Sequence, residues 1–207
     1  MEPARSRVSP RATYADLLAV PDHLTAELID GVIYAMARPR LRHAASLGTM
    51  TADLTLAFGL RKPRSAGPGG WVLLPEPELH LGGEDPRDLV LTPDIAGWRR
   101  ERMAEVPDTA ASELAPDWIC EILSPSTEGF DRIKKMEYYG RVGVKWAWLV
   151  NIAARSVEVY QHNGHAWEFL GGTERDASAR LRPFDAVEFD LTEWWPLGEP
   201  DPGLKPE

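Results

Sequence analysis

Apolar residues recur with helical spacing in one long stretch of the chain. The residues that lie three and four positions apart there are Leu47, Met50, Leu54 and Phe58. This stripe predicts an amphipathic helix over residues 43–60. A second helix is expected over 131–142, and shorter ones over 14–19, where Thr13 can cap the first turn, and over the DLTEWW segment.

Short apolar runs between these helices predict β-strands. AELIDGVIYAM indicates two strands around Asp30-Gly31, a residue pair that accepts the positive φ angles of a hairpin turn. The further strand segments are WVLL, ELHL, LVLTPDIAGW, DWICEIL, KWAWLV, SVEVYQ and AWEFL. DWICEIL is mostly apolar, as a strand buried on both faces would be. Within LVLTPDIAGW, Pro93 predicts a bulge, a strand start or an edge position.

The order of these elements predicts the fold class. An early hairpin, a long helix, a run of strands, a second helix and a last set of strands indicate a mixed β-sheet flanked by helices. We expect an α/β (α+β) fold with an N-terminal β-hairpin and C-terminal strands. The 207 residues fit one domain. The expected divisions are a flexible N-terminus over 1–12, a single domain over 13–195 and a flexible Pro/Gly-rich tail over 196–207.

The composition excludes several classes of protein. No run approaches the roughly 20 apolar residues that a membrane span needs, and the first residues, MEPARSRVSP, contain no apolar core of a signal peptide. We therefore expect a cytoplasmic protein without a membrane partner. Cys120 is the single cysteine of the sequence, which excludes an internal disulfide and a cysteine-rich zinc site.

Charge is unevenly distributed along the sequence. The net charge of -9 argues against a nucleic-acid partner, because phosphate binding depends on Lys and Arg. Most of the acidic excess, however, lies from residue 158 onward. The segment 38–64 carries six bases against Asp53: Arg38, Arg40, Arg42, Arg61, Lys62 and Arg64. These bases form either a nucleic-acid face or ordinary solvated surface charge.

Two acids, Asp94 and Glu121, lie within apolar strand segments. A carboxylate buried there costs several kcal/mol unless it is paired, protonated or bound to a cation. Either acid could instead face solvent or pair with an arginine. Together, two carboxylates suit Mg²⁺ or Mn²⁺, ions that bind through one or two carboxylates and substrate phosphates.

The succession of motifs resembles a known family. The motifs are ELIDG, a His that opens a helix, PD, E-x-L-SPST, D-x-x-x-K-x-x-x-Y and a W-x-W-L-V strand, in this order over about residues 12–190. This set is similar to the Uma2 family, formerly DUF820, which is placed among the PD-(D/E)xK restriction-endonuclease-like nucleases. The resemblance implies a restriction-endonuclease-like core.

The resemblance also implies a metal site. Asp94 matches the first metal-binding acid of the pattern and Glu121 the second, and the backbone carbonyl of Ile122 would be a third ligand. The implied cofactor is Mg²⁺ or Mn²⁺.

The catalytic cation of the superfamily is missing from its usual position. The pattern has a Lys two residues after the Glu, on the same strand face, where this chain has Leu123. Lys135 matches the Lys that the family carries four residues before a Tyr, here Tyr139, and Lys134 is the competing candidate.

Two further residues match family positions. Glu27 matches an early acid that helps to hold the metal or a water, with a solvent-facing hairpin acid as the alternative. His43 matches the helix-opening His, where an imidazole could contact a phosphate or carry a proton. Helix capping or core packing is the alternative role for His43.

These residues predict a metal-dependent endonuclease that hydrolyses phosphodiester bonds of DNA, with RNA as the alternative substrate and a homodimer as the expected assembly. A catalytically inactive nuclease-fold protein, acting as a binding or interaction module, is the alternative that Leu123 and the acidity favour. A hydrolase that uses Asp94 and Glu121 as acid and base on a sugar is a further alternative.

Overall fold

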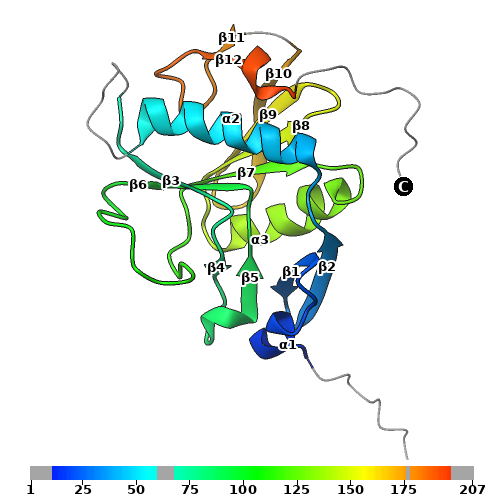
Figure 1. Cartoon of the computed structure of the whole chain (residues 1–207). Coiled ribbons are helices and arrows are strands. Elements are labelled where there is room, and N and C mark those ends of the chain that lie inside the picture. Colours follow the sequence, from blue (N-terminus) through cyan, green and yellow to red (C-terminus); the bar gives the residue numbers. More distant parts are fainter. Residues whose placement is uncertain (1–10, 60–67, 176–177, 197–207) are drawn as a thin grey trace, which may run out of the picture.

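Two larger β-sheets, the two-stranded sheet β11-β12 and a small number of helical segments form the structure, a computed structural model that describes residues 11–59, 68–175 and 178–196 (Figure 1). The helical segments are α1 (Tyr14–Leu18), α2 (Leu41–Phe58), η1 (Pro86–Asp88), η2 (Phe130–Lys135), α3 (Met136–Arg141) and η3 (Leu191–Trp194). The strands are β1 (Leu24–Ile29), β2 (Val32–Ala37), β3 (Trp71–Pro75), β4 (Leu79–His80), β5 (Leu89–Leu91), β6 (Ile95–Arg99), β7 (Trp118–Leu123), β8 (Trp146–Asn151), β9 (Ser156–His162), β10 (Trp167–Glu174), β11 (Ser178–Ala179) and β12 (Phe189–Asp190).

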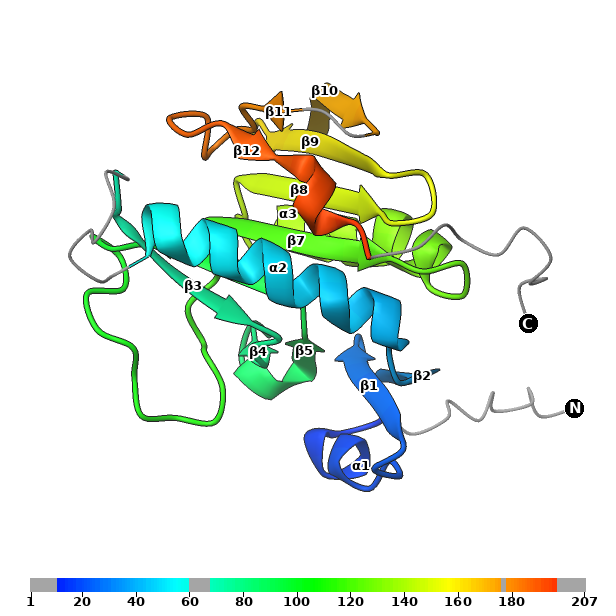
Figure 2. The same ribbon diagram turned by 45° about the horizontal axis from the view of Figure 1, so that its top comes forward.

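The larger sheet has six strands in the order β10-β9-β8-β7-β6-β3. Neighbours are antiparallel except β7 and β8, which are parallel and are connected through η2 and α3. α2 crosses one face of this sheet, and η2 and α3 lie on the other (Figures 1 and 2). The mixed sheet flanked by helices is the predicted fold class.

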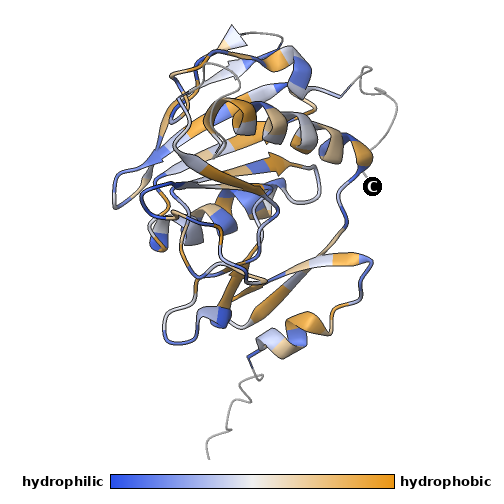
Figure 3. Ribbon diagram, turned by 60° about the vertical axis from the view of Figure 1, so that its left-hand side comes forward, coloured by the Kyte–Doolittle hydropathy of each residue, from blue (hydrophilic) through white to orange (hydrophobic). Residues whose placement is uncertain are grey.

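Strand β7 divides the core into two layers. Its six residues are all buried, as the apolar run predicted, and the apolar colouring of the central strands is visible in Figure 3. Cys120 and Ile122 face α2 and its buried stripe, whereas Ile119 and Leu123 face α3. Because side chains alternate along a strand, Glu121 lies on the α3 side with Leu123.

The predicted stripe of α2 is confirmed, and all four of its residues are buried: Leu47, Met50, Leu54 and Phe58. They pack beneath an aromatic cluster in which the rings of Trp118 and Trp148 meet edge to face at 5.0 Å and both contact Phe184. The helix begins two residues earlier than predicted, at Leu41.

The smaller sheet has the order β2-β1-β5-β4 and begins with the predicted hairpin. Asp30 and Gly31 have φ angles of 51° and 75°, so the turn uses the left-handed conformation that this residue pair accepts. Thr13 caps α1 with reciprocal hydrogen bonds to Asp16, which confirms the short first helix.

The segment LVLTPDIAGW was expected as one strand and is two. β5 ends at Leu91 in the smaller sheet and β6 begins at Ile95 in the larger one. Pro93 lies between them, where the missing N–H of proline interrupts no ladder. Thr92, Pro93 and Asp94 therefore join the two sheets, and Asp94 lies beside a strand rather than within it.

The second long helix also differs from expectation. Residues Phe130–Lys135 are wound as a π-helix, and only Met136–Arg141 are α-helical. The predicted DLTEWW helix is the short 3₁₀ turn η3. In the described part of the chain, no helix combines the length and apolar character that crossing a bilayer requires. Arg61, Lys62 and Arg64, the tail over 197–207 and residues 1–10 of the predicted N-terminal arm lie outside the described residues.

Candidate active site

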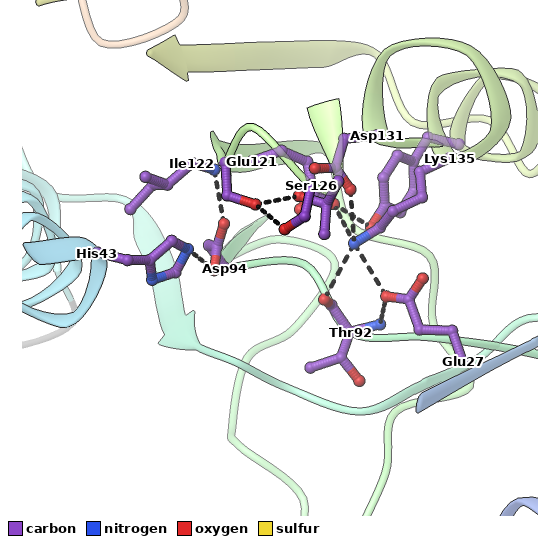
Figure 4. Close-up of polar contacts among 12 residues, drawn as sticks. Glu27, His43, Thr92, Asp94, Glu121, Ile122, Ser126, Asp131 and Lys135 are labelled. Carbon is purple, nitrogen blue, oxygen red and sulfur yellow. Dashed lines mark hydrogen bonds and ion pairs between the residues drawn. The ribbon is translucent and has the colours of Figure 1, made fainter. Parts of the chain in front are cut away.

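The predicted site residues meet where the two sheets join and η2 begins to cover them (Figure 4). Strand β1 contributes Glu27, the β5–β6 connection contributes Asp94, β7 contributes Glu121 and η2 contributes Lys135. Glu27, Glu121 and Lys135 each have a relative exposure of 3%. The alternative of a solvent-facing Glu27 is therefore wrong.

The inner half of the site consists of the groups around the Lys135 ammonium: Glu27, Thr92, Glu121 and Asp131. Nζ of Lys135 lies 2.8 Å from Oε1 of Glu121 and 2.9 Å from Oε1 of Glu27. It also donates to the carbonyl oxygen of Thr92 at 3.2 Å, and Oδ1 of Asp131 lies 3.9 Å away. An ammonium has three N–H donors, so three near acceptors occupy all of them.

Lys134 and Lys135, the two candidate cations, have different neighbours. Lys134 is partly exposed and lies over the ring of Tyr138, with its Nζ 5.4 Å from the ring centroid. Only Lys135 reaches the carboxylates.

Charge in the inner half is unbalanced. Burial lowers the pKa of Lys135, but the carboxylates of Glu121, Glu27 and Asp131 outweigh burial and hold this pKa well above its ordinary value. Burial raises the pKa of Glu121 well above its ordinary value; Lys135 opposes the rise, and Asp131, Asp94 and Glu27 add to it. The ammonium is therefore charged, and the raised pKa of Glu121 reflects a buried cluster in which carboxyl groups outnumber the ammonium beside them.

Glu121 has a second donor in Tyr139. The phenol O–H donates to Oε1 of Glu121 at 2.6 Å, and Tyr139 itself is completely buried. Asp131, Lys135 and Tyr139 are four residues apart, a spacing that places them on one side of the helical segment. Tyr139, the Tyr of the family motif, therefore contacts the same carboxylate oxygen as Lys135.

The outer half of the site is built around Asp94. Its Oδ2 accepts from the backbone N–H of Ile122 at 2.6 Å, and its Oδ1 lies 2.9 Å from Nε2 of His43. The two side chains are 14% and 11% exposed. Burial lowers the pKa of His43, but the hydrogen bond and negative charge of Asp94 raise it by more, so the imidazole is charged more readily than a free one.

His43 does not cap its helix. The N-cap residue is Arg40, which makes no side-chain capping bond, and His43 is the third residue of α2. Its Nδ1 is buried without a partner among the described residues. The imidazole therefore acts on Asp94 rather than on the helix end.

The Ile122 backbone lies beyond the end of a ladder. Pairing between β6 and β7 stops at Ile95 and Cys120, so the Ile122 N–H is available to Asp94. In an antiparallel pair the N–H and C=O of one residue point to the same side. The Ile122 carbonyl accordingly lies on the side of Asp94, as the resemblance implied for a third ligand.

The position of the usual lysine is closed to solvent. Leu123 is 5% exposed and packs in the same apolar cluster as Met136 and Tyr139. It shares the face of Glu121, as strand alternation predicted. The positive charge on this face is instead that of Lys135 on η2.

The donor set suits a hard divalent ion in an open site. In the ranges that the structure describes, no group of three or more His, Cys, Asp and Glu side chains is placed to hold a metal ion. Mg²⁺ rarely uses such groups and binds through one or two carboxylates, carbonyl oxygens, waters and phosphates. The excess of buried carboxyl groups and the buried, unpartnered Oε2 of Glu27 are what a bound cation would compensate.

The sequence analysis assigned no role to two residues of the site. Asp131 is the first residue of the D-x-x-x-K-x-x-x-Y motif and is buried beside Lys135, four residues later. Thr92 contributes only backbone: its carbonyl accepts from Lys135 and its N–H donates to Oε1 of Glu27 at 3.0 Å. Backbone ligands of this kind leave no trace in residue type.

The predicted basic regions differ in structure. Arg38, Arg40 and Arg42 are exposed just before and at the start of α2, close in sequence to His43. The sequence carries a second group of bases after Asp131, namely Arg132, Lys134, Lys135, Arg141 and Lys145. In this second group, Arg132 forms ion pairs with Glu128 and Glu158. The described part of the first group is therefore the more open basic surface.

The mixed sheet, with Asp94 directly before β6 and Glu121 within β7, agrees with a nuclease fold of the restriction-endonuclease-like class. The chain belongs to the Uma2 family, since the family model described as "Putative restriction endonuclease" matches residues 12–192. No curated protein matches it.

A solved structure shares the fold. The crystal structure of "a putative nuclease belonging to DUF820 from Anabaena variabilis ATCC 29413" superposes with a TM-score of 0.66 at 20% sequence identity. The match covers 88% of this chain and 97% of that one. At this identity the likeness shows a common fold.

Proposed function

We propose that this protein is a metal-dependent endonuclease that hydrolyses phosphodiester bonds of DNA, with RNA as the less favoured substrate. The observation that supports this proposal most directly is the charge imbalance of the site. Glu27, Asp94, Glu121 and Asp131 lie in or beside one buried cluster that contains Lys135 and His43 as its cations. A site that needs further positive charge suits a divalent ion and a phosphodiester bound to it.

Asp94, Glu121 and the Ile122 carbonyl are the residues that would hold Mg²⁺ or Mn²⁺. When bound, such an ion supplies an activated water and stabilises charge on the phosphate and the leaving oxygen. Ile122 N–H and His43 hold the Asp94 carboxylate from two sides. The carboxylate can therefore turn little, and its remaining lone pairs keep a fixed direction.

Lys135 acts on Glu121 in this proposal. Its ammonium and the Tyr139 hydroxyl both contact Oε1 of Glu121 and fix the orientation of this carboxylate. Glu27 and Thr92 fix the ammonium in turn. His43 has its Nε2 bonded to Asp94, which leaves Nδ1 as the atom that can take or release a proton.

Nucleic acid would approach along the exposed bases at the start of α2. Arg38, Arg40 and Arg42 precede or begin the helix that carries His43. Contacts of arginine to phosphate give affinity without sequence specificity and weaken with salt. We also propose a homodimer; the cytoplasmic location stays a prediction from the sequence.

A cleavage assay tests the proposal. The purified chain is incubated with single- and double-stranded DNA and RNA in Mg²⁺, Mn²⁺ or EDTA. Cleavage in either ion and none in EDTA is expected. Cleavage that continues in EDTA would contradict the metal-dependent mechanism.

The binding-module alternative is favoured by one specific observation. All three donors of Lys135 are engaged within the protein, and Leu123 is apolar, so neither position offers a donor to the phosphate in this arrangement. Salt-sensitive binding of nucleic acid with no cleavage in either ion would support this alternative.

A further inference from the structure

An exposed apolar side chain stands among arginines close to the candidate site. Leu41, the first residue of α2, has a relative exposure of 89%, the highest of the large apolar side chains in the described part of the chain. Its neighbours Arg40 and Arg42 are exposed as well. Two residues after Leu41, the imidazole of His43 contacts Asp94 at 2.9 Å (Figure 4). Leu41 therefore lies within one helical turn of the residue that joins α2 to the site.

The connection between β2 and α2 holds Leu41 in a fixed position. Nε of Arg38 donates to the carbonyl oxygen of Asp22 at 2.9 Å. The ring of Pro39 restricts the backbone at the next residue. Leu41 then begins a regular helix, whose buried stripe packs on the larger sheet. The exposed leucine is therefore presented by the anchored end of a helix rather than by a free loop.

The surroundings of Leu41 favour nucleic acid as the group that covers it. A single exposed leucine is common on protein surfaces, but this one lies in a segment that also exposes Arg38, Arg40 and Arg42. These arginines supply the positive charge that phosphates require. Proteins that bend DNA combine the same two features, since basic residues hold the phosphates while an apolar side chain inserts between base pairs.

The depth of the candidate site gives such an insertion a purpose. The side chains of Asp94 and Glu121 are 14% and 4% exposed, so little of either carboxylate reaches the surface. The phosphates of a regular duplex lie on the outside of a stiff rod. A phosphate can approach recessed acids more closely on a strand that has left the regular stack.

We propose that Leu41 inserts between neighbouring bases and opens the duplex beside the scissile bond, while Arg40 and Arg42 contact the flanking phosphates. The substrate class is then a locally unstacked strand of DNA. Cleavage of that strand rests on the proposed function, whereas the insertion requires only DNA binding. Because opening costs least where pairing is already disturbed, single strands and mismatched duplexes should be cut faster than a continuous duplex.

Unstacking is tested without cleavage, in EDTA. The probe is a short duplex with 2-aminopurine in place of several adenines, because the fluorescence of this base rises when it leaves the stack. Wild type should raise the fluorescence, and Leu41→Ala should bind through the remaining arginines without raising it. Leu56→Ala is the matched control, since Leu56 is 69% exposed near the other end of the same helix, and it should behave like wild type. A wild type that binds this duplex without raising the fluorescence overturns the inference.

Cleavage gives a second measurement. Leu41→Ala should cut a continuous duplex roughly tenfold more slowly, because it loses most of the apolar area that insertion buries. It should cut a single strand at close to the wild-type rate, since that substrate needs no opening. Equal losses on both substrates, or no loss on either, contradict the role of Leu41. Thermal unfolding should match wild type, because truncation of an exposed side chain leaves no cavity.

The outcomes separate this inference from the proposed function. Unstacking in EDTA with no cleavage in Mg²⁺ or Mn²⁺ contradicts the proposed function and supports the insertion. Cleavage of a continuous duplex as fast as of a single strand contradicts the insertion alone. Sedimentation tests the competing occupant: if Leu41→Ala converts a wild-type dimer to a monomer, Leu41 belongs to a contact between two copies and the inference is wrong.

Discussion

The ammonium of Lys135 and the carboxylate of Glu121 lie 2.8 Å apart, although one is carried by a helical segment and the other by the strand before it. Each side chain is 4% exposed. The PD-(D/E)xK pattern places the lysine on the strand itself. Here Leu123 occupies that position and makes apolar contacts. The positive charge on the same face of the sheet is that of Lys135, which η2 carries.

The acids and Lys135 should respond differently to substitution. Asp94→Asn or Glu121→Gln should abolish both ion binding and cleavage, because each deletes a charge that the ion needs. Lys135→Ala should retain ion binding while cleavage falls by roughly 10²- to 10³-fold, the loss typical of one preorganised electrostatic group. Calorimetry and a plasmid-nicking assay measure the two effects, with Lys134→Ala as the control. Wild-type cleavage by Lys135→Ala would refute this role of the lysine.

The His43 imidazole should report the charge of Asp94. Asp94 holds the pKa of His43 above its ordinary value of 6.5, so Asp94→Asn should lower it. The His43–Asp94 pair therefore stabilises the fold below pH 6.5, and this contribution is lost as the pH rises through the raised pKa of His43. An NMR titration in EDTA, with the other histidines as internal references, measures the change. An unaltered His43 titration in Asp94→Asn would show that the contact is absent in solution.

The Arg132–Glu158 pair should affect acid stability. Arg132 donates two hydrogen bonds to Glu158, which lower the pKa of Glu158 below its ordinary value of 4.5. This contribution is present above pH 4.5 and is lost as the pH falls through the lowered pKa. Glu158→Gln should therefore be less stable at neutral pH and lose less stability on acidification. Urea unfolding measures both. Glu137→Gln, whose partner Arg141 lies 3.9 Å away on the surface, is the control expected to match wild type.

The α2 stripe should dominate the stability of the helix–sheet interface. Met50 is 0% exposed, so Met50→Ala leaves a cavity and should lower the free energy of unfolding by about 2–5 kcal/mol. Leu56 on the same helix is 69% exposed, and Leu56→Ala should change the free energy of unfolding by less than about 0.5 kcal/mol. Denaturant titrations compare the two. Equal effects would mean that α2 does not pack as described.

Edge strand β10 is the surface we expect to mediate a dimer. It is eight residues long and exposes Phe169 and Leu170, with relative exposures of 59% and 40%. A long exposed edge strand is a template for pairing with another chain. Sedimentation should give a dimer for wild type and a monomer for Phe169→Lys. A wild-type monomer of 23.1 kDa at micromolar concentration would exclude the dimer.

Much of the fold could be predicted because its signals are local. The α2 stripe repeats over four turns, and the Asp30-Gly31 turn demands a conformation that few other pairs adopt. The break between β5 and β6 was harder to predict. Pro93 indicated an irregularity, but nothing local says that the chain leaves one sheet and enters another.

The candidate site was predictable in its residues but not in its contacts. Asp94 and Glu121 stand out against apolar neighbours, and the family motif indicates Lys135. That the ammonium is held by Glu27 and Thr92 depends on how the two sheets dock. Asp131 was part of the motif but received no role, because an acid on a helix is usually exposed and its burial follows from tertiary structure alone.

The connection Thr92–Pro93–Asp94 has a consequence for the order of folding. Its first residue is bonded to Glu27 of the smaller sheet and its last to Ile122 of the larger one. Neither sheet contains enough of these partners to assemble the centre alone. A half-folded chain with one sheet formed therefore lacks the arrangement described for cleavage, and hydrolytic competence is tied to completion of the whole fold.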